Sequence, residues 1–169
     1  MMKLYLLRHA IADVRDPVKY PDDSLRPLTK EGKDKFRRIC GGIQRLRLAF
    51  DLVVSSPYTR AQQTAEIFCE ELKISKAQLV LSENLTPFGD PQALFEEISA
   101  QYPNMDNLVC VGHEPYLSEL IGALLCGNAA ASITMKKGGL CCLTLSQLDF
   151  AGYATLEWLL TPAQLIAMS

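Results

Sequence analysis

The sequence contains no apolar run that approaches the roughly 18 residues needed to span a bilayer. Its first apolar segment is also too short for a secretory signal. We therefore expect a cytoplasmic protein that makes no membrane contact. A large excess of charge is missing too, since the formal net charge is -2. This balance argues against nucleic-acid binding, although a local cationic pocket remains compatible with it.

Paired cysteines and several phosphate-binding motifs are also absent. None of the six cysteines has C-x-x-C spacing, which argues against disulfides and a zinc site. Cys110, Cys141 and Cys142 instead lie in apolar runs, where a small residue suits a protein core. The P-loop, the dinucleotide-binding glycine pattern and the C-x5-R spacing of cysteine phosphatases do not occur. We expect neither a metal nor an organic cofactor.

The chain alternates short apolar runs with helical patterns, in a composition typical of one globular domain spanning residues 1–169. Strands are predicted at residues 3–7, 52–54, 79–81, 108–111, 140–145 and 153–160. Helices are predicted over residues 30–45, 59–72 and 91–101, and from 114 to about 125. This order predicts an α/β protein, a three-layer α/β/α sandwich with a mostly parallel sheet. The last two strands are expected to pair antiparallel at its edge.

Both histidines of the chain directly follow apolar runs that are predicted to be buried strands. Arg8 and His9 follow the first run, His113 follows the fourth, and Arg60 comes shortly after the second. Ligands of open α/β sheets bind at the carboxyl ends of the strands. We therefore expect two arginines and two histidines to converge at one edge of the sheet.

These residue types suit phosphoryl transfer. The planar donor fork of arginine matches phosphate oxygens, and a neutral imidazole can attack phosphorus to form a phosphohistidine. A like charge about 4 Å away costs on the order of 4 kcal/mol at an effective dielectric constant of about 20, so neighbouring arginines keep His9 neutral. A hydrogen bond from its other ring nitrogen to a backbone carbonyl would fix the tautomer.

The sequence L-R-H-A at residues 7–10 resembles the R-H-G signature of the histidine phosphatase superfamily, with Ala10 at the glycine position. Three further segments occur in the order and spacing of that family: R-P-L-T at 26–29, S-S-P-Y-T-R-A-Q-Q-T-A at 55–65, and V-G-H-E-P at 111–115. Chain length and the R-P-L-T element are most similar to SixA-type phosphohistidine phosphatases. The resemblance implies a phosphoglycerate mutase-like fold. A positive φ angle after His9 would strain Ala10.

The resemblance further implies catalytic roles for four residues. His9 would be the nucleophile, Arg8 and Arg60 would bind the phosphate, and His113 would donate to the oxygens of the transferred group. These roles agree with the demand of phosphoryl transfer for electrostatic stabilisation.

Two further residues are candidates for substrate binding. Arg26 could contact the substrate from the loop over the site, or pair with Asp22 or Asp23. Ser55 could face the pocket, but Ser56 and Pro57 also fit a plain turn between strand and helix, and we favour the turn. Tyr58 could help to form the pocket wall.

The nature of the leaving group favours a protein substrate. Larger members of the family carry a glutamate that protonates an alkoxide, and no counterpart is evident between Glu83 and Asp90, where Asp90 is better explained as a helix cap. The imidazole of a phosphohistidine substrate leaves more easily than an alkoxide, so its departure depends less on such an acid. We expect a monomer that dephosphorylates a histidine-phosphorylated protein such as a phosphotransfer domain. The alternatives are a phosphomonoesterase of small metabolites and a noncatalytic phosphate-binding module.

The basic surface over residues 30–47 is expected to be solvated rather than to dock an acidic partner.

Overall fold

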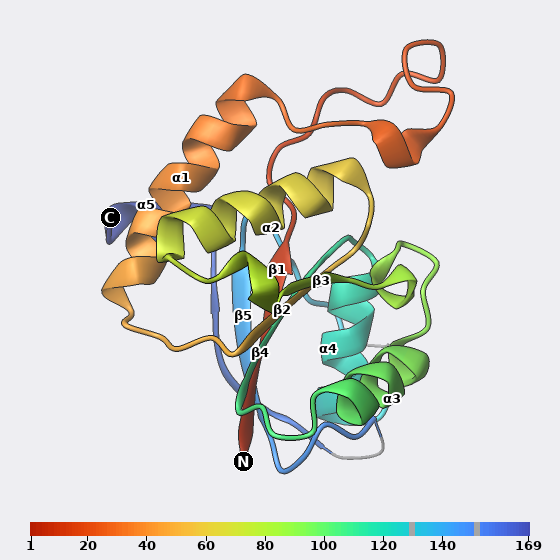
Figure 1. Cartoon of the computed structure of the whole chain (residues 1–169), viewed down its shortest axis with the longest axis vertical. Coiled ribbons are helices and arrows are strands. Elements are labelled where there is room, and N and C mark those ends of the chain that lie inside the picture. Colours follow the sequence, from red (N-terminus) through yellow and green to blue (C-terminus); the bar gives the residue numbers. More distant parts are fainter. Residues whose placement is uncertain (129–130, 151–152) are drawn as a thin grey trace.

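The computed structural model describes residues 1–128, 131–150 and 153–169, and in them six strands form one mixed sheet (Figure 1). The strands are β1 (Met2–Arg8), β2 (Leu52–Ser55), β3 (Leu79–Leu81), β4 (Asn107–Gly112), β5 (Leu140–Leu145) and β6 (Thr155–Leu160). Their order is β3-β2-β4-β1-β5-β6. Strands β1 to β4 are parallel, whereas β5 runs antiparallel to β1, and β6 to β5. The predicted parallel sheet with an antiparallel edge is confirmed.

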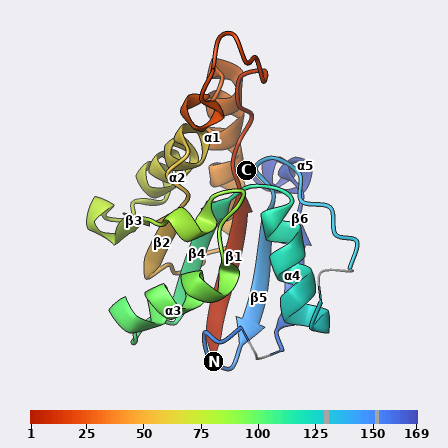
Figure 2. The same cartoon turned by 90° about the vertical axis from the view of Figure 1, so that its right-hand side faces the viewer.

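Helices cover both faces of this sheet (Figures 1 and 2). They are α1 (Lys30–Arg45), α2 (Thr59–Leu72), α3 (Pro91–Gln101), α4 (Tyr116–Cys126) and α5 (Pro162–Ala167). Helices α1, α2 and α5 pack on one face, and α3 and α4 on the other, so the three-layer sandwich is confirmed. No helix in the described part of the chain has the length and apolar character to cross a membrane.

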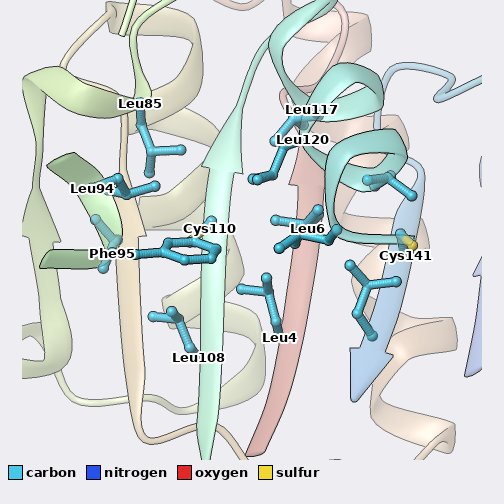
Figure 3. Close-up of a cluster of buried hydrophobic side chains, with 14 of the residues drawn as sticks. Leu4, Leu6, Leu85, Leu94, Phe95, Leu108, Cys110, Leu117, Leu120 and Cys141 are labelled. Carbon is cyan, nitrogen blue, oxygen red and sulfur yellow. The ribbon is translucent and has the colours of Figure 1, made fainter. Parts of the chain in front are cut away.

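The core follows the two-residue alternation of a buried strand. Leu4 and Leu6 of β1 face the layer of α3 and α4, as Figure 3 shows, whereas Tyr5 and Leu7 pack against the layer of α1, α2 and α5. The three cysteines predicted for the core are buried in β4 and β5, and all six cysteines are free thiols.

Side-chain caps define where α1 and α3 begin. The Thr29 side chain accepts the Gly32 amide at 2.9 Å and starts α1. Asp90 accepts the amides of Gln92 and Ala93, with proline at the first position of α3. The bounds of α1, α2 and α3 agree with the sequence prediction, and Asp90 is the helix cap that it was expected to be.

Strands β1, β2 and β4 extend one residue beyond the predicted range at one or both ends, and three other elements differ more from the prediction. Helix α4 begins at Tyr116 rather than at Glu114, because Glu114 and Pro115 form the turn that precedes it. Strand β6 begins at Thr155 rather than at Tyr153, where its pairing with β5 starts. Helix α5 is short and was not predicted, although Thr161 caps it.

Candidate active site

The carboxyl ends of β1, β2 and β4 meet at one edge of the sheet. Arg8 lies opposite Gly112 in the register, and the His9 amide donates to the Gly112 oxygen at 3.0 Å. On the other side of β4, the Ser56 amide donates to the Val111 oxygen at 3.0 Å. The next residue after Gly112 is His113, whose ring centroid lies 5.1 Å from that of His9. Backbone pairing thus brings the two histidines together.

A cavity of about 760 Å³ opens at this edge. Five of the six residues predicted for the site line it: Arg8, His9, Arg26, Arg60 and His113. Ser55 does not line it, because its hydroxyl is fully buried and donates to the Ser56 carbonyl at 2.9 Å. This contact fits the turn interpretation of Ser55.

His9 is buried, with 6 % of its surface exposed, and its ring is fixed by one hydrogen bond. The Nδ1 atom donates to the Ala10 carbonyl at 2.7 Å. A carbonyl only accepts, so the proton sits on Nδ1 and the Nε2 atom of the neutral ring carries a free lone pair. Burial lowers the pKa of His9 to about 3, against the opposing effect of the Ala10 hydrogen bond. The nearby positive charges of Arg60, Arg8 and Lys137 lower this pKa further.

The backbone around His9 is tied to helix α2. The Ala10 amide donates to the Thr64 hydroxyl at 3.0 Å, and this hydroxyl donates to the Arg60 carbonyl at 2.6 Å. Among the described residues other than glycine, only Arg47 and Lys73 have positive φ angles. Ala10 therefore needs no left-handed conformation, and alanine at this position of the signature is unstrained.

His113 is held by Ser56, which was predicted only as part of a turn. Its Nε2 atom lies 2.8 Å from the Ser56 hydroxyl oxygen, and its ring packs edge-on against Tyr58 at 5.2 Å. Burial lowers the pKa of His113 to about 2, and His9 and Arg60 contribute to this shift. The ring is therefore neutral at physiological pH.

The arginines are fixed by contacts at the ends of their side chains. Arg8 donates from Nη1 to the Met135 carbonyl at 2.6 Å. Arg60 donates from Nη1 to the Asp23 carbonyl at 2.9 Å, and its Nη2 atom lies 3.1 Å from the Asp23 carboxylate. Arg26 donates from Nε to the same carboxylate at 2.9 Å. Arg26 thus lines the cavity and makes the predicted pair with Asp23, whereas its contact with a substrate stays a prediction.

Three buried side-chain nitrogen atoms at the site have no hydrogen-bond partner within the described part of the protein. Among the described residues, the buried side-chain polar atoms without a hydrogen bond are Arg8 Nε, Arg60 Nε, His113 Nδ1 and Tyr116 Oη. The first three belong to residues that line the cavity. Buried polar groups are rarely left unpaired, and such groups in a native structure often mark a site of function. Two arginines that line one cavity can bind an anion.

Sequence reasoning missed four polar residues of the site: Ser56, Asp23, Lys137 and Glu114, although Asp23 had been considered as a partner of Arg26. Lys137 and Glu114 both line the cavity. Burial and the charges of nearby arginines, Arg8 first, lower the pKa of Lys137. The signal for Lys137 was its place just before a strand, because an antiparallel strand begins at the edge where parallel strands end. Among the described residues, no group of three His, Cys, Asp or Glu side chains is placed to hold a metal ion.

Known proteins are similar to this chain in sequence and in fold. The family model of the histidine phosphatase superfamily (branch 1) matches residues 4–107. An uncharacterised protein of Picosynechococcus sp. is 34 % identical over 140 residues, which cover 82 % of each chain. Phosphohistidine phosphatase SixA of Escherichia coli (strain K12) is 27 % identical over 165 residues, covering 97 % of this chain and 96 % of its own. A structure of the protein histidine phosphatase SixA complexed with tungstate superposes with a TM-score of 0.82 and 25 % identity, covering 97 % of this chain and 99 % of the other.

Proposed function

Because the chain belongs to the histidine phosphatase superfamily and is a phosphatase, we propose that it dephosphorylates a histidine-phosphorylated protein through a phospho-His9 intermediate. The observation that carries the proposal is a neutral His9 with an unpartnered Nε2 atom, in one cavity with Arg8, Arg60 and His113. Similarity to SixA proteins, one of them complexed with the phosphate-like anion tungstate, supports the substrate class.

In the first step, the Nε2 lone pair of His9 forms a bond to phosphorus while the P–N bond of the substrate breaks. A substrate ring that carries a proton on its second nitrogen leaves as neutral imidazole, so this step requires no acid from the enzyme. In the second step, water attacks the phosphorus of phospho-His9. Inorganic phosphate is released and the His9 ring regains its lone pair.

Arg8, Arg60 and His113 stabilise the charge that spreads over the phosphoryl oxygens in both steps. The two guanidinium groups supply N–H donors, and the His113 ring supplies one more. When the Ser56 hydroxyl donates to Nε2 of His113, the neutral ring carries its proton on Nδ1, which makes this atom a donor. Ser56 thereby acts as a positioning residue for His113.

Trapping of the intermediate tests this function. Wild-type protein and His9→Ala are each mixed with a protein carrying ³²P-phosphohistidine, quenched in alkali and separated on a denaturing gel. We expect acid-labile label on the wild type and none on His9→Ala, whereas His113→Ala forms labelled protein more slowly. Label of equal intensity on His9→Ala would refute the nucleophile assignment.

Glu114 favours a second candidate function, a phosphomonoesterase of small metabolites. Neither Glu83 nor Asp90 lines the cavity, whereas Glu114 does, and its carboxylate accepts the Ser118 amide at 3.0 Å. A carboxyl in this place can protonate an alcohol leaving group. A competition assay with phosphohistidine proteins and phosphorylated sugars or glycerates decides between the two. Much faster turnover of the esters would exclude our choice of substrate.

A further inference from the structure

Two large apolar side chains are exposed on the wall of the catalytic cavity. Val14 and Phe88 line the cavity together with His9 and His113, although 78 % of Val14 and 92 % of Phe88 is exposed. They come from two separate segments, the loop after β1 and the connection between β3 and α3. We call this pair the apolar rim.

Phe88 is presented by a well-fixed turn. The Gly89 amide donates to the Thr86 carbonyl at 3.0 Å. The backbone of Asn84 lies so close to Gly89 that a Cβ atom there would be 2.2 Å from the Asn84 oxygen. Glu97 of α3 accepts hydrogen bonds from the side chain of Asn84 at 3.0 Å and from that of Ser82. This tightly packed turn therefore holds the Phe88 side chain in an exposed position.

Val14 is fixed in a similar way. Its amide donates to the Asp13 carboxylate at 2.8 Å, and the Asp13 amide donates to the Pro27 carbonyl at 2.9 Å. The Asp13 carbonyl accepts Nη1 of Arg26 at 2.8 Å. The segment that carries Val14 is thus anchored to a residue of the active site.

The rim and the floor of the cavity differ in chemistry. We call Arg8, Arg60 and the two histidines the floor of the cavity, because none of them is exposed. The arginines of the floor are cationic donors that suit a phosphoryl group, whereas neither side chain of the rim can form a hydrogen bond. Hydroxyl or carboxyl groups of a small phosphate ester would meet apolar surface there and lose contacts with water. A protein that inserts a phosphohistidine would instead cover the rim with the apolar side chains beside it, which releases water from both surfaces.

We propose that Val14 and Phe88 form a docking surface, continuous with the catalytic cavity, for a protein whose phosphohistidine is flanked by apolar side chains. This inference rests on the proposed function and adds the means of selection: the rim favours a protein-borne phosphohistidine over the same bond in a small molecule. Aromatic side chains in the part of an interface that excludes water often supply most of its binding energy.

The test compares one chemical bond in two settings. Steady-state kinetics are measured with a histidine-phosphorylated protein and with the free amino acid phosphohistidine, for wild type, Phe88→Ser and the double variant Val14→Ser/Phe88→Ser. We expect the ratio of kcat/KM for the protein to kcat/KM for the amino acid to fall about tenfold in the double variant, mainly through KM for the protein. Because each variant is judged by this ratio, a general loss of folded enzyme cancels.

Tyr153→Ser is the matched control. Tyr153 is 76 % exposed and precedes β6, which begins opposite Thr144, and Thr144 pairs with Lys3 at the end of β1 remote from His9. We expect it to leave the ratio unchanged. An unchanged ratio in the double variant, or an equal fall in Tyr153→Ser, would overturn the docking surface while leaving the proposed function intact. Absence of wild-type turnover of any phosphohistidine protein would overturn the function itself.

Discussion

The Asp23 carboxylate holds two arginines of the active site at the same time, since it contacts Arg26 and Arg60. Burial opposes its ionisation, but the hydrogen bond from Arg26 and the charge of Arg60 keep the pKa of Asp23 below its usual value. An anion inside a phosphate site weakens phosphate binding by repulsion. The presence of Asp23 at the site is explained if its carboxylate orients the guanidinium group of Arg60.

Replacing Asp23 by asparagine separates these two effects. Asp23→Asn keeps the shape and the backbone carbonyl that accepts Arg60 Nη1, but it removes the negative charge. We expect inorganic phosphate to inhibit the variant at least as strongly as the wild type, while kcat falls about tenfold because Arg60 is less well oriented. Steady-state kinetics with phosphate as inhibitor measure both. Weaker inhibition at an unchanged kcat would contradict this role.

At the scale of residues, the sequence predicted the parts of the site that follow parallel strands. His9 and His113 could be placed because each begins the loop after a buried apolar run. Asp23 could not be placed in the same way, because it lies in the middle of a long loop whose path depends on contacts with Arg26 and Arg60. Ser56 was assigned to a turn because nothing in the sequence indicates its contact with His113.

At the scale of elements, the turn before β5 closes one side of the cavity. Gly138 has a φ angle of +80°, and its amide donates to the carbonyls of Arg8 and His9 at 3.0 and 3.2 Å. A Cβ atom at Gly138 would also lie 2.8 Å from Ile39 Cδ1. The turn carries Lys137 into the cavity, so its conformation links the sheet edge to the charge of the site.

Gly138→Ala should therefore impair both stability and catalysis. We expect it to lower the free energy of unfolding by about 1–2 kcal/mol, since alanine is strained at a positive φ angle. It should also reduce kcat/KM because the backbone of Arg8 and His9 shifts. Gly41→Ala is the matched control: Gly41 lies within α1, and its nearest neighbour would be Ser169 Cβ at 3.3 Å. Urea unfolding and kinetics that show equal effects at both glycines would contradict this explanation.

The elements themselves were largely predictable, because capping residues and apolar periodicity are local signals. Thr29 and Asp90 define the starts of α1 and α3, and the bounds of α2 also agree. Strand β6 was placed two residues early because its start depends on pairing with β5, a tertiary contact. Helix α5 has six residues, too few for a clear periodic pattern, although Thr161 and Pro162 are typical of a helix start.

At the scale of the whole molecule, the charge is distributed unevenly. The chain carries a formal net charge of -2, yet five cationic and three acidic side chains line the catalytic cavity. A cationic cavity in a mildly acidic protein concentrates anionic substrates at one place and repels them elsewhere on the surface. The same cations and the burial of the site keep both histidines neutral, which affects the stability of the entire fold.

Two buried neutral histidines should make folding sensitive to mild acid. The folded-state pKa values of His9 and His113 are lowered to about 3 and about 2, whereas an unfolded histidine has its ordinary value of about 6.5. The unfolded chain therefore binds more protons below pH 6.5, and stability falls as the pH decreases from this value toward the folded-state pKa values. As the pH falls from 7 to 5, each histidine should lower the free energy of unfolding by about 2 kcal/mol. Urea unfolding of His9→Asn should show a pH dependence smaller by about that amount, and a dependence equal to that of the wild type would show that His9 is not held neutral by the fold.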